Sequence, residues 1–175
     1  IEEDTFCLNP EKVKESITNK TKAIVVTNIF GHPAKLKKLK KIADENNIYL
    51  IEDNAQAPLA FEHGFYAGTI GHIGVFSLNY HKHIHTGEGG VCCTNDQTLN
   101  LRLQSIRNHG ENIVAPIKMK NISNMIGLNF RMTELSAAIG IAQLDKLDQI
   151  VDRRQKIVKK INELLDERIK PAVAQ

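Results

Sequence analysis

A single lysine in the middle of the chain is placed for covalent chemistry. Lys82 lies five residues after Ser77 and five residues before the glycine-rich turn Gly87-Glu88-Gly89-Gly90. A lysine amine can form an imine with an aldehyde and can later move a proton. The Ser77 hydroxyl could bind a phosphate, and the glycines give the backbone freedom to turn. An isolated lysine in such a turn would be read as a surface residue, so the hypothesis depends on the whole pattern.

A carboxylate follows an apolar run further upstream. Asp53 comes directly after residues 48–52, where a ligand is expected beyond the carboxyl end of a strand. Such a carboxylate could keep a nitrogen of a bound heterocyclic ring protonated, which makes the ring an electron sink. Gln56 could donate a hydrogen bond to a bound group, and Ala55 is small enough to let a ring lie close. Taken alone, Asp53 is equally well explained as a turn or helix-capping residue.

A second candidate for phosphate binding lies near the start of a long helical pattern. The side-chain amide of Asn129 precedes Thr133, where the pattern begins, and helix N-termini favour anions. Asn129 could equally be a turn or capping residue.

Three alternating histidines raise the question of a metal site. In an extended segment His81, His83 and His85 would all face one side. Three ring nitrogens on one strand seldom converge at the ~2 Å distances that zinc requires, and no fourth ligand is evident. We therefore predict no metal, and expect these side chains to line or flank the cleft beside Lys82.

The elements that must position these residues begin with a βαβ unit. Residues 22–28 predict a strand, and their continuous apolar run suits a parallel strand covered on both faces. Apolar residues at helical spacing follow, and residues 48–52 predict the next strand. The crossover between two such parallel strands should be right-handed.

The remaining elements follow from the same kinds of pattern. Asn9-Pro10 predicts the start of a short helix that reaches about residue 17. Residues 64–72 predict a connecting loop, residues 73–77 and 90–94 two strands, and Asn95 or Asp96 the cap of a helix. Residues 111–125 predict a loop. From Thr133 a helical pattern continues almost to Pro171, long enough to predict a break or a domain-linking helix.

Composition limits the class of protein. The chain has 175 residues, of which 42% are hydrophobic and 25% charged, with a net charge of +3. One sizeable α/β core is expected at this length. The basic residues lie on solvated helix faces without interleaved aromatics, so nucleic-acid binding is not expected. No apolar run approaches the ~20 residues of a membrane span. Three cysteines predict reduced, buried thiols and a cytoplasmic protein.

Three stretches of the chain resemble one enzyme family. They are the segment from Phe76 to Gly90, the segment from Ile51 to Ala57, and Gly127-Leu128-Asn129-Phe130-Arg131-Met132-Thr133-Glu134-Leu135. Together they are similar to the DegT/DnrJ/StrS family of sugar aminotransferases, which use pyridoxal 5'-phosphate. The resemblance implies an α/β fold, the three-layer, mostly parallel sheet of a type I aminotransferase large domain, incomplete and with a long C-terminal helix. Residues 1–147 would be the central part of the large domain, and residues 148–175 a helix leading toward a small domain.

The resemblance also implies roles for single residues. The lysine matching Lys82 carries the cofactor imine, the aspartate matching Asp53 pairs with the pyridine nitrogen, and the glutamine matching Gln56 approaches the ring hydroxyl. The serine matching Ser77 binds phosphate, and the asparagine matching Asn129 reaches the phosphate of a neighbouring subunit. A homodimer with two composite sites follows. Typical reactions pass an amino group, usually from glutamate, to a nucleotide-linked keto sugar.

The sequence departs from the family pattern at several positions. Asn54 stands where a small apolar residue is usual, and residues 78–81 replace a more familiar run, so the sugar-facing surface is expected to differ. Two alternatives to an aminotransferase stay open. One is a sugar dehydratase on the same cofactor, against which Lys82 argues, because some dehydratases carry a histidine there. The other is a non-catalytic scaffold that acts in binding or assembly.

Overall fold

The computed structural model describes residues 1–111 and 125–172. The expected loop over residues 111–125 therefore lies almost wholly outside the described residues. A four-stranded sheet in the order β1-β2-β5-β6 forms the centre of the fold. Its strands are β1 (Ala23–Thr27), β2 (Tyr49–Asp53), β5 (Ile73–Ser77) and β6 (Gly90–Cys93). β1, β2 and β5 run parallel and β6 runs antiparallel to β5, so the sheet is mostly parallel as predicted.

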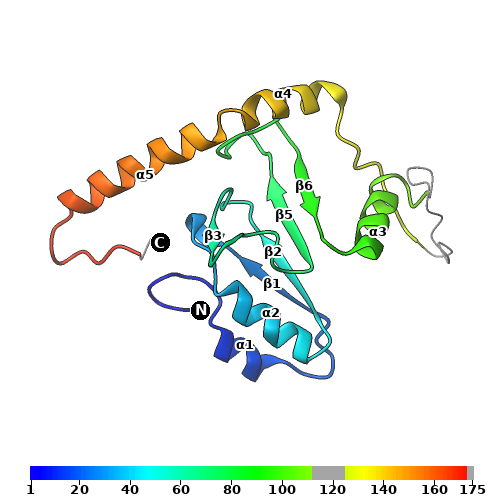
Figure 1. Cartoon of the computed structure of the whole chain (residues 1–175), viewed down its shortest axis with the longest axis horizontal. Helices are drawn as coiled ribbons and strands as arrows, with labels where there is room; N and C mark the ends of the chain where they lie inside the picture. Colours follow the sequence, from blue (N-terminus) through cyan, green and yellow to red (C-terminus); the bar gives the residue numbers. More distant parts are fainter. Residues whose placement is uncertain (112–124, 173–175) are drawn as a thin grey trace.

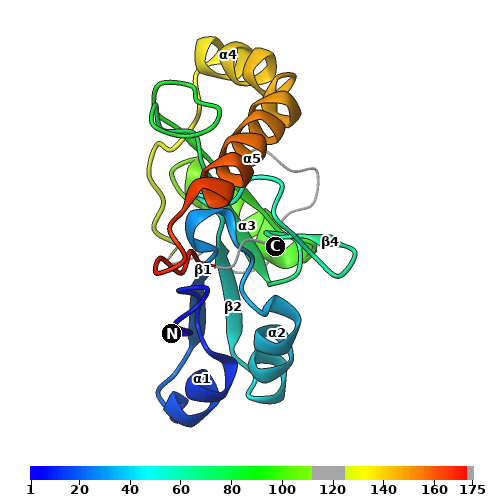
Figure 2. The same cartoon turned by 90° about the vertical axis from the view of Figure 1, so that its left-hand side faces the viewer.

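The core lies between the sheet and two helices, α1 (Pro10–Ser16) and α2 (Leu36–Glu45). Asn9 caps α1, because its Oδ1 accepts hydrogen bonds from the N–H groups of Glu11 and Lys12. In α2, the apolar side chains recur at helical spacing and are buried against the sheet: Leu36, Leu39, Ile42 and Ala43. Figure 2 shows the two helices beside the β1 and β2 strands. This is the βαβ unit that the sequence predicts.

Only one face of β1 is covered by the described residues. Ile24 and Val26 are buried, whereas Val25 between them is 59% exposed. Tyr49, the first residue of β2, is 51% exposed. The prediction that β1 is covered on both faces was therefore wrong for this chain. A run of apolar residues indicates that both faces of a strand favour burial, but it does not indicate which segment packs against each face.

A small hairpin interrupts the loop expected over residues 64–72. Strands β3 (Phe61–Glu62) and β4 (Phe65–Tyr66) pair antiparallel across His63 and Gly64. These two residues have φ angles of 44° and 94°, the positive values that a tight two-residue hairpin turn requires. This hairpin was not predicted from the sequence, because its strands are too short to show a period.

Three more helices follow in the part of the chain that the structure describes. α3 (Gln97–Arg107) is capped by Asp96, one of the two predicted caps. α4 (Glu134–Leu144) and α5 (Leu147–Leu164) are separated at Asp145 and Lys146, which confirms the predicted break in the long helical pattern. In Figure 1, α4 lies above the upper ends of β5 and β6, and α5 extends from it to the left, away from α1 and α2.

The cysteines are all free thiols, as expected, but not all buried. Cys7 belongs to the core, whereas Cys92 on β6 is exposed and Cys93 is half-buried. The prediction of buried thiols was therefore wrong for Cys92, which points to the opposite side of an edge strand from Cys93. Among the described helices, none is both long and apolar enough to cross a membrane.

Candidate active site

Two of the predicted site residues lie at the same edge of the sheet. Asp53 is the last residue of β2, and its register partner on the neighbouring parallel strand is Val75. Ser77, two residues further along β5, ends that strand. Carboxyl ends of parallel strands form the usual ligand-binding edge of an α/β sheet. The fold thus brings a carboxylate and a hydroxyl together where chemistry is expected.

The turn after β2 is held by hydrogen bonds of Asp53. Its Oδ1 accepts a hydrogen bond from the Ala55 N–H at 3.0 Å, and its carbonyl oxygen accepts one from the Asn28 N–H at 3.0 Å. The first of these is the local turn that aspartate side chains commonly make. Asp53 is half-buried, so its carboxylate remains reachable while its backbone is fixed.

Asn54 faces the opposite way from Asp53 and is buried. Its Oδ1 accepts a hydrogen bond from Asn28 Nδ2 at 2.7 Å, and its Nδ2 donates one to the Glu52 carbonyl oxygen at 3.1 Å. Asn28 in turn accepts a hydrogen bond from the Ala34 N–H at 2.8 Å. Asn54, which stands where the family pattern has a small apolar residue, therefore forms a buried amide pair with Asn28 that connects the ends of β1 and β2.

Gln56 is oriented by a residue in a strained backbone conformation. Its Oε1 accepts a hydrogen bond from the Phe30 N–H at 3.0 Å, and Phe30 has a φ of 54°. Because the carbonyl end of the Gln56 side chain is engaged, the amide nitrogen is the end that can donate to a bound group. Gln56 and Ala55 are both half-buried.

Lys82 lies in a compact loop that follows β5, which we call the lysine loop (residues 78–89). The Leu78 N–H donates to the Gly89 carbonyl oxygen at 2.8 Å, and the Thr86 N–H donates to the Leu78 carbonyl oxygen at 3.0 Å. These two hydrogen bonds close the loop on itself. The Lys82 N–H donates to the Asn79 carbonyl oxygen at 2.9 Å, and the Lys82 side chain is half-buried. The lysine is thus carried by an ordered turn directly beyond the end of β5.

The three histidines of this loop do not form a strand. His81 is exposed, while His83 and His85 are half-buried in a segment of turns and bends. Within residues 1–111 and 125–172, no group of three or more histidine, cysteine or acidic side chains is arranged to hold a metal ion. Burial lowers the pKa of His83, and the positive charges of Arg154 and Lys82 lower it further. His83 therefore lies close enough to α5 to sense the charge of Arg154.

Asn129 lies apart from the sheet edge, beside the end of α3. It forms an isolated antiparallel bridge with Asn108, and its Oδ1 accepts a hydrogen bond from the Arg131 N–H at 3.3 Å. Its side chain is exposed. The described structure places Asp53 and Ser77 at the ends of neighbouring parallel strands, and Gln56 in the turn that follows Asp53. The hydrogen bonds of Asn129 in the described residues join it to the end of α3 and to Arg131 instead.

A buried carboxylate next to Asp53 was not predicted from the sequence. Glu52 is 0% exposed, and its side chain accepts hydrogen bonds from the N–H groups of Gly68 at 2.6 Å, Ile70 at 2.9 Å and Gly71. Burial raises the pKa of Glu52, and these backbone hydrogen bonds offset part of that effect. Glu52 is thus the residue that fixes residues 68–71 against β2.

One signal in the sequence could have revealed Glu52. Leu50 and Glu52 share a face of β2, and Leu50 is fully buried. A carboxylate at a core-facing strand position needs donors to offset its desolvation. A search for glycines that can bring backbone N–H groups close would have led to residues 68–71.

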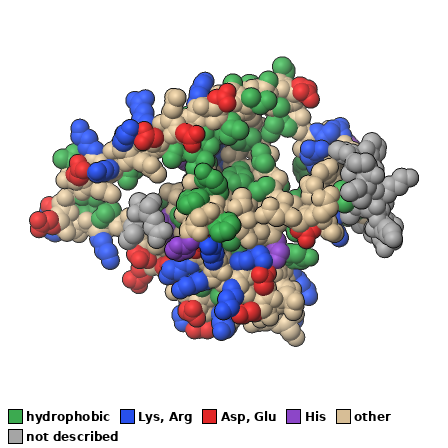
Figure 3. All heavy atoms as spheres, in the orientation of Figure 1, with side chains coloured by type: hydrophobic (Ala, Val, Ile, Leu, Met, Phe, Trp, Pro, Cys, Tyr) green, Lys and Arg blue, Asp and Glu red, His purple; other side chains and the backbone are tan. Residues whose placement is uncertain are grey.

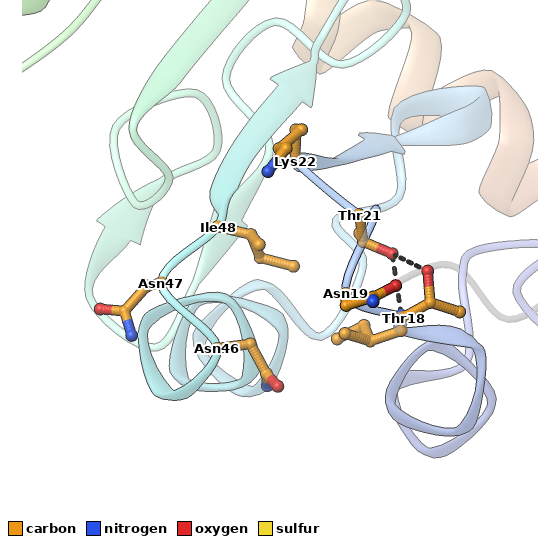
Figure 4. Close-up of a pocket in the computed structure, with 8 residues that line it drawn as sticks. Thr18, Asn19, Thr21, Lys22, Asn46, Asn47 and Ile48 are labelled. Carbon is orange, nitrogen blue, oxygen red and sulfur yellow. Dashed lines mark hydrogen bonds between the residues drawn. The ribbon is translucent and has the colours of Figure 1, made fainter.

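A surface hollow at the other end of the sheet is not this site. It is lined by residues around the β1 entrance and the α2 exit, including Thr18, Asn19, Lys22 and Asn47. Figure 4 shows Thr18 and Thr21 joined by hydrogen bonds there, the Thr18 N–H donating to Thr21 Oγ1 at 3.0 Å. These residues lie at the amino ends of β1 and β2, whereas ligands in open α/β sheets bind at the carboxyl ends.

Comparison with known proteins identifies the family of this chain. The profile of the DegT/DnrJ/EryC1/StrS aminotransferase family matches residues 1–174. The chain belongs to this family. The resemblance predicted from the sequence is therefore confirmed, as is the α/β aminotransferase fold.

Relatives with different reactions are similar to this member of the family. GDP-perosamine synthase of Escherichia coli O157:H7 is 37% identical over 93% of this chain, which covers 44% of that enzyme. L-Glutamine:2-deoxy-scyllo-inosose aminotransferase of Streptoalloteichus tenebrarius is 35% identical over 95% of the chain and 41% of its own length. The solved E. coli GDP-4-keto-6-deoxy-D-mannose-3-dehydratase with bound hydrated PLP has a TM-score of 0.77 at 34% identity, over 91% of this chain and 44% of that one. The chain thus spans less than half the length of these relatives.

Proposed function

We propose that this family member binds pyridoxal 5'-phosphate and transfers an amino group, from glutamate, to a keto group on a nucleotide-linked sugar. The observation that carries this proposal is the position of the lysine loop, which follows β5, the strand next to the one that ends at Asp53. The donor set at this edge has the right chemistry for the cofactor, because it combines an amine, a carboxylate, an amide and a hydroxyl. When bound, the cofactor would act as the electron sink for the carbon that gains or loses the amine.

Each residue has a separate task in this proposal. Lys82 Nζ is the amine that binds the cofactor and later holds or gives up a proton. The Asp53 carboxylate supplies the negative charge that keeps the ring nitrogen protonated. Gln56 donates to the ring hydroxyl oxygen, with Ala55 leaving room beside the ring. The Ser77 hydroxyl donates to the phosphate.

Asn129 would act on the site of a second copy, which makes the protein a homodimer. Supporting this, the segment around it exposes large apolar side chains: Ile126 (86%), Leu128 (57%), Phe130 (62%), Leu135 (80%), Ile141 (67%) and Leu144 (59%). Figure 3 shows hydrophobic side chains gathered over α4 and the strands below it. A surface of this kind commonly marks a protein interface. In this proposal the Asn129 of each copy reaches the sheet edge of the other.

The domain division and location belong to the same proposal. Residues 1–147 form the central part of a cofactor-binding domain, and residues 148–175 lead into a second domain. The break at Asp145 and Lys146, directly before Leu147, supports a boundary there. The free thiols Cys7, Cys92 and Cys93 are consistent with the cytoplasm.

Absorbance spectroscopy tests the lysine. Protein mixed with pyridoxal 5'-phosphate should show the visible band of lysine-bound cofactor, and Lys82→Ala should abolish it. Lys38→Ala, on the exposed side of α2, is the matched control and should keep the band. After borohydride reduction, mass spectrometry should find the cofactor on the peptide that contains Lys82. An unchanged band in Lys82→Ala would reject the assignment, and no band in the wild type would favour a non-catalytic scaffold.

Product analysis tests the reaction. Nucleotide-linked keto sugars are incubated with 15N-glutamate, and with 15N-glutamine in parallel. We expect 15N in the sugar product. Loss of a sugar hydroxyl without 15N incorporation would instead identify a dehydratase.

A further inference from the structure

A threonine of the lysine loop lies between two glycines that come from different parts of the chain. Thr86 is 6% exposed, and its Oγ1 donates a hydrogen bond to the Glu88 carbonyl oxygen at 2.8 Å. A Cβ atom built on Gly89 would lie 2.6 Å from Thr86 Oγ1, and one built on Gly140 would lie 3.1 Å from Thr86 Cγ2. Gly140 is on α4, so the missing side chain lets this helix approach the loop closely.

The rest of α4 is weakly anchored to the described chain. None of its residues is buried, although the helix is mostly apolar, and Leu135, Ile139 and Ile141 are each about half exposed or more. The close approach of Gly140 to Thr86 is therefore a point at which α4 meets the lysine loop. Thr86 itself is buried, so its side chain has little free volume into which it can retreat from an added atom.

The hydrogen bonds of the loop connect Thr86 to Lys82. The Thr86 N–H holds the Leu78 carbonyl oxygen, and Leu78 is followed by Asn79, whose carbonyl oxygen accepts from the Lys82 N–H. Asn79 Nδ2 also donates to Glu88 Oε1 at 2.8 Å, which ties the two arms of the loop together. A displacement of Thr86 by a few tenths of an ångström thus reaches the turn that carries the lysine.

We propose that Gly140 is a positioning residue that sets the distance between α4 and the lysine loop, and thereby the placement of Lys82. The consequence for catalysis rests on the proposed function, whereas the coupling between helix and loop does not. Since α4 continues into α5 after the break at Asp145 and Lys146, the same contact connects the C-terminal helix to the reactive lysine.

A double-mutant cycle tests the contact. Gly140→Ala adds the Cβ that meets Thr86 Cγ2. Thr86→Ser removes Cγ2 and keeps the hydroxyl that bonds to Glu88. Ala142→Leu, at an exposed position of α4, is the control for adding apolar volume to the helix. Amide hydrogen exchange at Leu78, Lys82 and Thr86 is measured in all variants, together with the melting temperature.

The melting temperature and the amide exchange rates distinguish a positioning role of Gly140 from a merely structural one. Alanine is a better helix former than glycine, so a merely structural effect of Gly140→Ala would leave the melting temperature equal or higher and the loop unchanged. We expect the Lys82 and Thr86 amides of Gly140→Ala to exchange about tenfold faster, a typical coupling for side chains in contact. In Gly140→Ala/Thr86→Ser the rates should return toward those of Thr86→Ser alone.

Two results would overturn the proposal. One is unchanged exchange in the lysine loop of Gly140→Ala. The other is an increase in the double variant equal to the product of the two single effects, because independent sites multiply. Exchange requires no cofactor, so rescue in the double variant combined with no visible band in the wild type would uphold the positioning role and reject the proposed function.

Discussion

The buried carboxylate of Glu52 offers the sharpest test of how the site is supported. In Glu52→Gln one of the two side-chain oxygens becomes an NH2 group. The glutamine can keep its oxygen where Oε1 accepts from Ile70 and Gly71, but its NH2 then faces the N–H of Gly68, which donates to Oε2 at 2.6 Å. Two donors then oppose each other in a site with no exposed surface.

The expected loss of stability follows from these contacts. One unpaired buried N–H costs about 1–3 kcal/mol, and the two remaining hydrogen bonds become weaker because the acceptor loses its charge. Burial of a neutral amide is less costly than burial of a carboxylate, which offsets part of the loss. We expect the free energy of unfolding to fall by about 2 kcal/mol, which is within the range of mutations that break a buried network.

Urea unfolding and hydrogen exchange measure this effect together. The control is Glu62→Gln, since Glu62 is also buried but accepts one backbone hydrogen bond, from the Lys37 N–H at 3.0 Å. We expect a smaller loss in the control, and faster exchange of the Gly68, Ile70 and Gly71 amides only in Glu52→Gln. Equal stability of Glu52→Gln and the wild type, or equal losses in both variants, would refute the role assigned to Glu52.

Three further predictions concern other parts of the structure. Burial lowers the pKa of His83, and the positive charges of Arg154 and Lys82 lower it further, so the folded protein binds a proton there less readily than the unfolded chain does. The free energy of unfolding should therefore have its full value above the ordinary histidine pKa and should fall as the pH drops through the lowered pKa. Across that pH range the melting temperature of His83→Asn should fall less than that of the wild type. A pKa of His83, measured by NMR, at or above the ordinary histidine value would contradict this. Asn54→Ala should cost about 1–3 kcal/mol in urea unfolding, because it leaves Asn28 Nδ2 unpaired in the core, and a neutral result would argue against the buried amide pair. Asp96→Ala should cost about 1 kcal/mol by removing the α3 cap at the Leu99 N–H, whereas Asp96→Ser should restore most of it.

Local patterns in the sequence determined most of the secondary structure and the identity of the chemical groups. The βαβ unit could be predicted because buried strands and amphipathic helices leave periods that depend on neighbouring residues alone. The caps Asn9 and Asp96 could be predicted for the same reason, since a cap bonds to backbone groups only two or three residues away. Lys82 and Asp53 stood out by their positions next to a glycine-rich turn and a strand end.

Tertiary structure decided which groups meet. The hydrogen-bond partners of Glu52 are backbone amides sixteen to nineteen residues further along the chain. Thr86 lies beside Gly140, which is too far away in the sequence for any local pattern to predict the contact. The exposure of Cys92 and of one face of β1 likewise depends on which segments cover the sheet. A side chain's chemistry is fixed by its residue type, whereas its partners are fixed only when distant segments pack together, because packing alone sets the distances between them.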